Sequence, residues 1–192
     1  MVGARLMVKE GVLENPKVDA IYGLHINSAT PVGVVRYKAE GFMAATQRFV
    51  IDVKGKQAHG SEPWMSIDPI VISAQIINGL QTIVSRNSKL TKEAAVVSVG
   101  SIHSGIRFNI IPESARLIGT IRTLDEEMKQ LILQRMYDLV PQIAKAYGGT
   151  ATVDITESAA LTYNDPKLTA TAVKSLKKAL GEEQVQEMLA VT

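Results

Sequence analysis

The sequence predicts an α+β fold: a ferredoxin-like βαββαβ sandwich inserted into part of a larger α/β domain. Two changes of hydrophobic period predict it. Alternation with a period of two gives way to a helical period near Ile67, and again near Asp125. The resulting order of strand, helix, strand, strand, helix, strand is typical of a four-stranded antiparallel sheet with both helices on one face. We place this sandwich at residues 44–158.

The first strand and helix are marked by a clear change of pattern. Phe49, Ile51 and Val53 occupy alternate positions, which is typical of a half-buried strand. From Ile67 onward the apolar residues recur on one helical face. Ser66 is the predicted N-cap of this helix, because a serine hydroxyl can accept a hydrogen bond from a free N–H group of the first turn.

The second half of the sandwich repeats this alternation. A valine-rich run at 94–102 and an alternating run at 115–122 predict the next two strands. Thr123 and Glu126 fit a capping box that opens the second helix, and the glycines at 148–149 fit its end. Alternating residues then predict the last strand.

The flanking segments, 1–43 and 159–192, do not fit the sandwich. They predict a helix end at 2–10, a strand at 18–26 that is apolar enough for burial on both faces, and a helix that begins at Asp165. These three elements cannot enclose a core of their own. We therefore expect both segments to be parts of a larger α/β domain.

The composition excludes several classes of function. A formal net charge of +2 with scattered Lys and Arg gives no argument for nucleic acid or an anionic membrane. The absence of Cys excludes disulfides and thiol chemistry. No apolar run approaches the roughly 20 residues of a membrane span, and the start of the chain lacks the apolar stretch of a signal peptide. We expect a soluble, cytoplasmic protein.

The three histidines show no paired spacing that would indicate a metal site. His25 ends an apolar strand, where catalytic ligands often lie, but from spacing alone a partly buried structural histidine is the favoured interpretation. His59 lies in a polar loop, and the residues leave a catalytic and an incidental role equally open. His103 is interpreted as a loop histidine without a role.

Two polar residues around the third strand are further candidates. Asn109 precedes that strand and Arg122 ends it, at a separation of 122 − 109 = 13 residues. Asparagine offers both a donor and an acceptor, and arginine offers a fork of donors for a carboxylate. From the residues alone, a turn asparagine and a surface arginine are the favoured interpretation.

Five strings, taken together and in order, resemble the M20 family of metallopeptidases and amidohydrolases, and most closely its aminoacylase, hippurate-hydrolase and auxin-conjugate-hydrolase branch. The resemblance covers essentially the whole chain. The strings are GARLM at 3–7 with EGV at 10–12, VDAIYGLH at 18–25, GKQAH at 55–59 with Pro63 and Asp68-Pro69, NIIP at 109–112, and GTIR at 119–122.

The resemblance implies roles for four residues. His25 falls on a metal ligand of the family. His59 falls on the histidine of the lid domain that reaches into the partner subunit's active site and polarises the scissile carbonyl. Asn109 and Arg122 fall on lid residues that contact the substrate, with Arg122 on its carboxylate.

The resemblance also implies the organisation of the enzyme. Residues 1–43 would belong to the metal-binding catalytic domain, 44–158 to a lid that forms a homodimer through an edge strand and adjoining helix, and 159–192 to the return into the catalytic domain. The implied cofactors are two divalent metal ions, Zn, Mn or Co. The implied substrate is an N-acyl amino acid or a short peptide, with neither nucleic acid nor membrane as a partner.

The sequence departs from the family pattern at several points. The early His-x-Asp segment, the Glu-Glu pair with the general base, and the late His ligand are not found in it, and Ser104 stands where many members have glycine. We expect the missing segments to lie outside residues 1–192, so that this chain alone is inactive. The competing hypothesis is a stand-alone, non-catalytic ferredoxin-like module for dimerisation or ligand binding.

Overall fold

The computed structural model describes residues 3–192, which fall into two compact units. The first unit contains the residues up to Met43 and Thr162–Val191. The second unit contains Ala44–Leu161 together with Thr192. The predicted sandwich therefore lies within the second unit.

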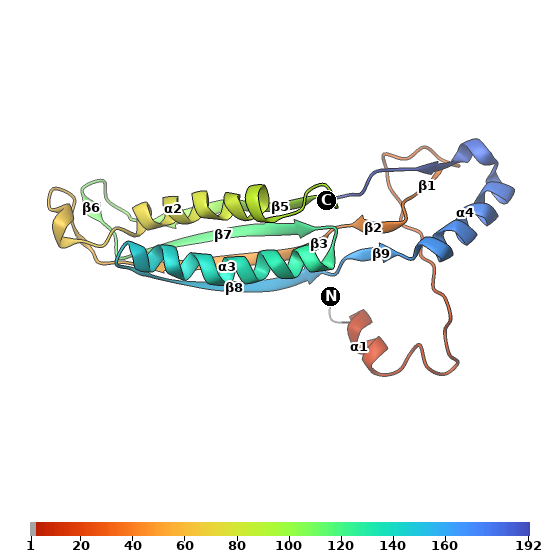
Figure 1. Ribbon diagram of the computed structural model, residues 1–192, viewed down its shortest axis with the longest axis horizontal. Helices are drawn as coiled ribbons and strands as arrows, with labels where there is room; N and C mark the ends of the chain where they lie inside the picture. Colours follow the sequence, from red (N-terminus) through yellow and green to blue (C-terminus); the bar gives the residue numbers. More distant parts are fainter. Residues whose placement is uncertain (1–2) are drawn as a thin grey trace. The chain divides into compact units, whose positions relative to one another are not determined.

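The second unit is built on a four-stranded antiparallel sheet with the strand order β5-β7-β3-β8 (Figure 1). This confirms the predicted α+β class and the antiparallel sheet. β5 extends two residues further than predicted, so that His103 lies in a strand and not in a loop. The strands are β3 (Ala45–Lys54), β5 (Ala95–Ser104), β7 (Ser114–Thr123) and β8 (Thr150–Ala159).

Two helices pack on one face of this sheet. α2 (Pro69–Thr82) continues into the π-helical turn η2 (Ile83–Asn87) and packs against β5 and β7, whereas α3 (Glu126–Ala146) packs mainly against β8 (Figure 1). Alternate strand residues and the inner helix faces form one buried cluster, and each such side chain contributes about 1.5–3 kcal/mol. Its largest members include Phe49, Ile51, Leu117, Ile121, Ile72, Ile76, Leu80, Ile132 and Met136.

A short ribbon lies at one end of the sandwich. β4 (Ala58–His59) pairs antiparallel with β6 (Ile110–Ile111), and the 3-10 turn η1 (Pro63–Met65) follows β4. The Gly55 N–H donates to the carbonyl of Glu113 at 2.8 Å and joins the ribbon to the ends of β3 and β7. The ribbon is thereby fixed to the sheet.

The predicted N-cap of α2 is wrong by two residues. The cap is Asp68, whose Oδ1 accepts hydrogen bonds from the N–H groups of Ile70 at 2.8 Å and Val71 at 3.3 Å. Pro69 occupies the first helical position and has no N–H, so the cap is the residue immediately before it. The hydroxyl of Ser66 instead donates to the carbonyl of Pro63 at 2.7 Å.

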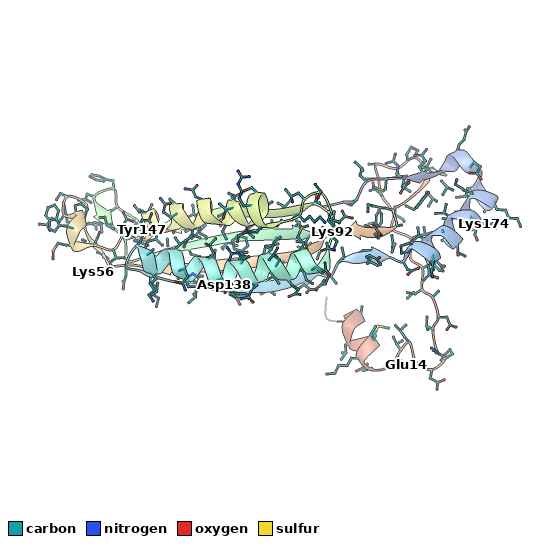
Figure 2. All side chains as sticks on the ribbon, in the orientation of Figure 1. Glu14, Lys56, Lys92, Asp138, Tyr147 and Lys174 are labelled. Carbon is teal, nitrogen blue, oxygen red and sulfur yellow. The ribbon has the colours of Figure 1, made fainter. Side chains whose placement is uncertain are left out.

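The predicted capping box of α3 is also wrong. Thr123 is buried at the end of β7, and Asp125 is the N-cap, accepting from the Met128 N–H at 2.9 Å. Lys92, labelled in Figure 2, lies 2.7 Å from the second oxygen of Asp125. Partial burial raises the pKa of Asp125, but the hydrogen bonds from Lys92 and the Met128 N–H outweigh it, so that the pKa lies below its ordinary value of 3.8.

We predict that Asp125→Asn lowers stability at pH 7 and that this loss disappears in acid. Asparagine caps helices as well as aspartate does, so the substitution removes only the charge. A carboxyl whose folded pKa is lowered stabilises the folded state above its unfolded pKa, and this contribution is lost as pH falls through the folded pKa. The urea midpoints of the parent chain and the variant should differ at pH 7 and converge as the pH falls further below 3.8. An equal difference at both pH values contradicts the assignment.

In the described part of the chain, the first unit holds two small strand pairs, two α-helices and one 3-10 helix. The helix predicted to begin at Asp165 is α4, and Asp165 is its N-cap, accepting from the N–H groups of Lys167 and Leu168 at 2.9 Å. None of the helices within residues 3–192 has the length and apolar character that crossing a membrane requires. The elements are α1 (Gly3–Lys9), β1 (Val35–Tyr37) parallel to β10 (Val185–Glu187), β2 (Glu40–Met43) antiparallel to β9 (Thr162–Asn164), α4 (Pro166–Leu180) and η3 (Glu182–Gln184).

The strand predicted at 18–26 does not form. Its apolar side chains are exposed, Leu24 by 84% and Ile26 by 93%. A strand needs a neighbouring strand to satisfy its backbone groups, and burial on both faces needs a layer on each side. Within the described part of the first unit no strand lies beside this segment. The predicted end of the first helix fits better: α1 ends at Lys9, and residue 2 lies outside the described range.

Candidate functional site

Two of the predicted site residues meet at the β4-β6 ribbon. His59 ends β4 and pairs with Ile110, which directly follows Asn109. The Gly60 N–H donates to the backbone carbonyl of Asn109 at 2.8 Å. A Cβ on Gly60 would lie 3.1 Å from that oxygen, so glycine permits this close approach. The structure therefore places His59 and Asn109 on adjacent, hydrogen-bonded backbone segments.

The His59 ring is exposed and is held by one neighbour. Its Nδ1 lies 2.6 Å from the Ser61 Oγ and 3.2 Å from the Ser61 backbone nitrogen. Sequence reasoning missed Ser61. The only signal for it was a hydroxyl residue two positions after the histidine in a polar loop, which is too common a pattern to indicate a contact.

Large apolar side chains surround this end of the unit and are also exposed. Trp64 and Met65 lie in η1, while Ile106 and Phe108 lie in the connection from β5 to β6. Phe108 is fully exposed and Trp64 is 75% exposed. Exposed apolar groups gathered at one place are typical of a contact surface. We call these four residues the apolar tip.

Arg122 lies at the other end of the sheet. It is the ninth residue of β7, which begins at Ser114 beside the ribbon, and 122 − 114 = 8 residues of strand span roughly 26 Å. Its Nη1 donates to the Oγ1 of Thr46. Within one chain, His59 and Arg122 are therefore too far apart to touch the same small molecule.

Arg122 lies on the sheet face opposite the helices. The same face carries Arg116, which donates two hydrogen bonds to Asp52 at 2.6 and 2.9 Å. The hydrogen bond from Arg116 lowers the pKa of Asp52, so this pair stays ionised at neutral pH. Arg116 is thus already paired with a carboxylate, whereas the partner of Arg122 is a neutral hydroxyl.

His25 lies in the first unit, in the exposed segment after α1. Its Nδ1 lies 2.6 Å from the carbonyl oxygen of Ile26. A carbonyl oxygen only accepts, so Nδ1 carries a proton, and in the neutral ring Nε2 then keeps the lone pair. This is the tautomer of a metal-ligating histidine. Within residues 3–192, however, no three His, Asp or Glu residues are grouped to hold a metal. The described residues supply one suitable ligand and not a dinuclear site.

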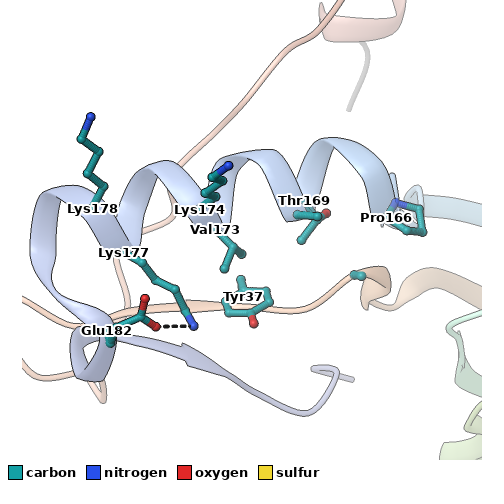
Figure 3. A pocket seen from close by; sticks show the side chains of 10 residues that line it. Tyr37, Pro166, Thr169, Val173, Lys174, Lys177, Lys178 and Glu182 are labelled. Carbon is teal, nitrogen blue, oxygen red and sulfur yellow. Dashed lines mark ion pairs between the residues drawn. The ribbon is translucent and has the colours of Figure 1, made fainter.

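The first unit also contains an open groove of about 510 Å³ along α4 (Figure 3). Tyr37 and Val173 line it, and at one end Lys177 pairs with Glu182 at 2.7 Å. The hydrogen bond that Lys177 donates to Glu182 raises the pKa of Lys177. None of the predicted site residues lines this groove. The structure therefore does not connect it with the predicted chemistry.

Comparisons with known proteins match this chain to peptidases and deacetylases. The family model described as a peptidase dimerisation domain matches residues 46–148. Thermostable carboxypeptidase 2 of Saccharolobus solfataricus is 39% identical over 175 residues, covering 91% of this chain and 44% of that protein. N-acetylcysteine deacetylase of Bacillus subtilis is 41% identical over 149 residues, covering 78% and 38%. The chain thus spans less than half the length of these relatives.

A solved structure gives the same assignment. The chain matches a Bacillus subtilis protein, described as a dinuclear metal binding peptidase of the M20 family, with a TM-score of 0.73 and 31% identity. The match covers 100% of this chain and 46% of that one. The family model, the relatives and this structure agree, and the chain belongs to the M20 peptidase family, with its dimerisation domain in the second unit.

Proposed function

We propose that this chain is the lid and part of the catalytic domain of a metal-dependent amidohydrolase that cleaves N-acyl amino acids or short peptides. A deacetylase of N-acetylcysteine and a carboxypeptidase are among its relatives. Both of those reactions break an amide bond and release an amino acid. The observation that carries the proposal is the position of His59, exposed in the β4-β6 ribbon at the far end of the sheet from Arg122.

This separation supports action between two subunits. Because roughly 26 Å of strand lies between the ribbon and Arg122, His59 and Arg122 of one chain cannot serve one small substrate. A second copy of the chain can bring its own tip to the substrate that Arg122 holds. The apolar tip supports this arrangement, since docking on a partner would remove its exposed apolar surface from water.

In this proposal each residue acts through its ordinary chemistry. The Arg122 guanidinium binds the carboxylate of the released amino acid through its fork of donors. Asn109 of the partner subunit, which lies beside the partner subunit's His59, contacts the substrate with its amide group. His59 of the partner subunit donates to the amide oxygen as negative charge develops there, and one such donor is worth on the order of 3 kcal/mol. Stabilisation of the developing negative charge therefore comes from the β4-β6 ribbon of one subunit. Orientation of the substrate carboxylate comes from the sheet of the other.

His25 is proposed as one metal ligand of the intact enzyme. Two divalent ions, Zn, Mn or Co, would supply an activated water there. The relevant observation is the contact of His25 Nδ1 with the carbonyl oxygen of Ile26, which in the neutral ring leaves the lone pair on Nε2. We assign residues 1–43 and 159–192 to the catalytic domain and 44–158 to the lid, and we propose the cytoplasm as the location.

The lid is proposed to be ferredoxin-like and to dimerise through α2 and β5. The order β5-β7-β3-β8, with a helix after the first and third strands along the chain, supports this topology. β5 and β8 are the two edges, and an open edge is normally protected by charge or by a partner. β5 and α2 contain no Asp, Glu, Lys or Arg, whereas β8 and α3 contain several. The uncharged side is therefore the better candidate for a covered surface.

The proposed role of Arg122 can be tested by titrating this chain with N-acetyl-L-alanine in an NMR experiment. We expect amide resonances near the end of β7 to shift with N-acetyl-L-alanine and not with its carboxamide, which lacks the negative charge. Arg122→Gln should abolish the shifts. The same samples with added Zn²⁺ or Mn²⁺ should release no alanine, because a catalytic zinc usually needs three protein ligands.

Arg48→Gln is the matched control for this titration. Arg48 lies opposite Thr120 in β7, on the same sheet face as Arg122 and also as an arginine on a strand. The control should retain the carboxylate-dependent shifts. Equal shifts with the carboxamide would contradict the substrate assignment and favour the stand-alone module. Metal-dependent release of alanine would contradict the proposed inactivity of the isolated chain.

A further inference from the structure

We infer that Ser61 is a positioning residue that fixes the proton of His59 on Nε2. The lid then presents a neutral N–H donor, and not an acceptor, at its exposed end. The tautomer follows from the contacts of His59 alone. Only the target of the donor, the amide oxygen of a substrate, rests on the proposed function.

The first step concerns the backbone of the turn. The Glu62 N–H donates to the carbonyl of His59 at 2.9 Å, which closes a tight turn over residues 59–62. The Gly60 N–H is occupied by the carbonyl of Asn109. The Ser61 N–H remains, and the turn directs it to the His59 ring, 3.2 Å from Nδ1. The fold therefore brings a backbone donor to one particular ring nitrogen.

The second step concerns what that nitrogen can be. A backbone N–H donates and never accepts, so Nδ1 must offer its lone pair. In a neutral imidazole the proton is then on Nε2. The Ser61 hydroxyl, 2.6 Å from Nδ1, can rotate to donate to the same lone pair. With the proton on Nδ1 instead, the Ser61 N–H would face another N–H and lose its acceptor.

The third step concerns the consequence for the tip. His25 has the opposite tautomer, because its Nδ1 faces a carbonyl oxygen. The same side-chain type therefore offers a lone pair in the first unit and a proton in the second. An oxyanion is stabilised by a donor placed before the charge develops, and an acceptor at that position would repel it. Ser61 selects the useful form of His59 before any substrate binds.

The test is a long-range ¹H–¹⁵N correlation spectrum of the histidine rings in the 192-residue chain. It is recorded at a pH well above about 6.5, the ordinary pKa of imidazole. The His59 ring should show a protonated Nε2 and a hydrogen-bonded, unprotonated Nδ1, and the His25 ring should show the reverse. Signals are assigned with His25→Asn and His59→Asn.

Ser61→Ala removes the hydroxyl and keeps the backbone N–H. The ratio of the His59 tautomer protonated on Nε2 to the one protonated on Nδ1 should fall roughly threefold or more, which is the effect of one ordinary hydrogen bond. Ser61→Thr should restore the ratio, because it returns a hydroxyl. His103, which lies in β5, serves as the reference and should not change. Unchanged amide resonances of β7 would show that the fold is intact.

Two outcomes would overturn the inference: a proton on Nδ1 of His59 in the parent chain, or identical His59 spectra for the parent and Ser61→Ala. Neither measurement needs a metal, a substrate or a second subunit. A failed tautomer test therefore leaves the proposed hydrolase function standing. A failed Arg122 titration, in turn, leaves the tautomer assignment standing.

Discussion

Gly119→Ala is expected to destabilise the second unit by about 3 kcal/mol, the upper part of the usual range for overpacking a core. Gly119 lies in β7 on the helix-covered face, directly opposite Phe49. A Cβ at this position would lie 2.2 Å from the Phe49 Cζ and 2.2 Å from the backbone oxygen of Ser98. The ring is completely buried, and the oxygen belongs to the neighbouring strand, so neither can move without disturbing the sheet.

The adjoining strand provides a matched control. Gly100 in β5 also lies within a strand, but the nearest atom to its added Cβ is the Ile118 oxygen at 3.8 Å, an ordinary contact. Gly100→Ala should change the free energy of unfolding by less than about 0.5 kcal/mol. Urea unfolding followed by circular dichroism compares the two variants. Equal losses at both positions would mean that strand propensity, and not the Phe49 contact, sets the cost.

The chain is expected to form a homodimer, and Ala74→Lys is expected to weaken it at least about 100-fold. Ala74 lies on the exposed side of α2, close to Val71, which is 47% exposed. If α2 and β5 meet their own copies across a two-fold axis, one new lysine per chain places two like charges in the interface. Like charges brought together in an interface cost several kcal/mol, and 1.4 kcal/mol corresponds to a tenfold change in affinity.

Ala146→Lys is the control for this experiment. Ala146 is an exposed alanine of α3, on the helix whose outer face is already charged. The same substitution there should leave the dimer intact. Light scattering from the parent chain and both variants over a concentration series gives the three dissociation constants. A parent chain that stays monomeric at high micromolar concentration would rule out lid-driven dimerisation.

The strands and helices of the sandwich could be predicted because each has a strong local pattern. Phe49, Ile51 and Val53 alternate in the sequence and all face the core. The helix caps were placed wrongly because several polar residues precede each helix, and the structure selects Asp68 and Asp125, whose carboxylates suit the positive end of a helix. Short-range competition of this kind is decided by backbone geometry that a pattern does not contain.

The segment at 18–26 failed for a different reason. Its run of apolar residues is a local pattern typical of a buried strand. A strand, however, forms only beside a neighbouring strand, and the described residues provide none there. Local sequence cannot show whether a partner is present.

The candidate site could be proposed only through family resemblance. Residue spacing left His59 undecided and favoured structural roles for His25 and Arg122. The distance between His59 and Arg122 depends on the register of β7, and the contact with Ser61 depends on one turn. The distance is set only when distant segments pair, and the Ser61 contact is set by the backbone of a turn that the residue pattern does not contain.

The central position of β3 has a consequence for how this unit folds. β3 is made first, yet it pairs with β7 and β8, and Thr46 waits for Ala159, 159 − 46 = 113 residues later. Contacts over such distances slow folding, because a long loop must close before they form. β5 and β7, joined by a short connection, can pair much earlier. We therefore expect the β5-β7 hairpin to form during synthesis before β3 joins it, with β3 open to association with other chains until then.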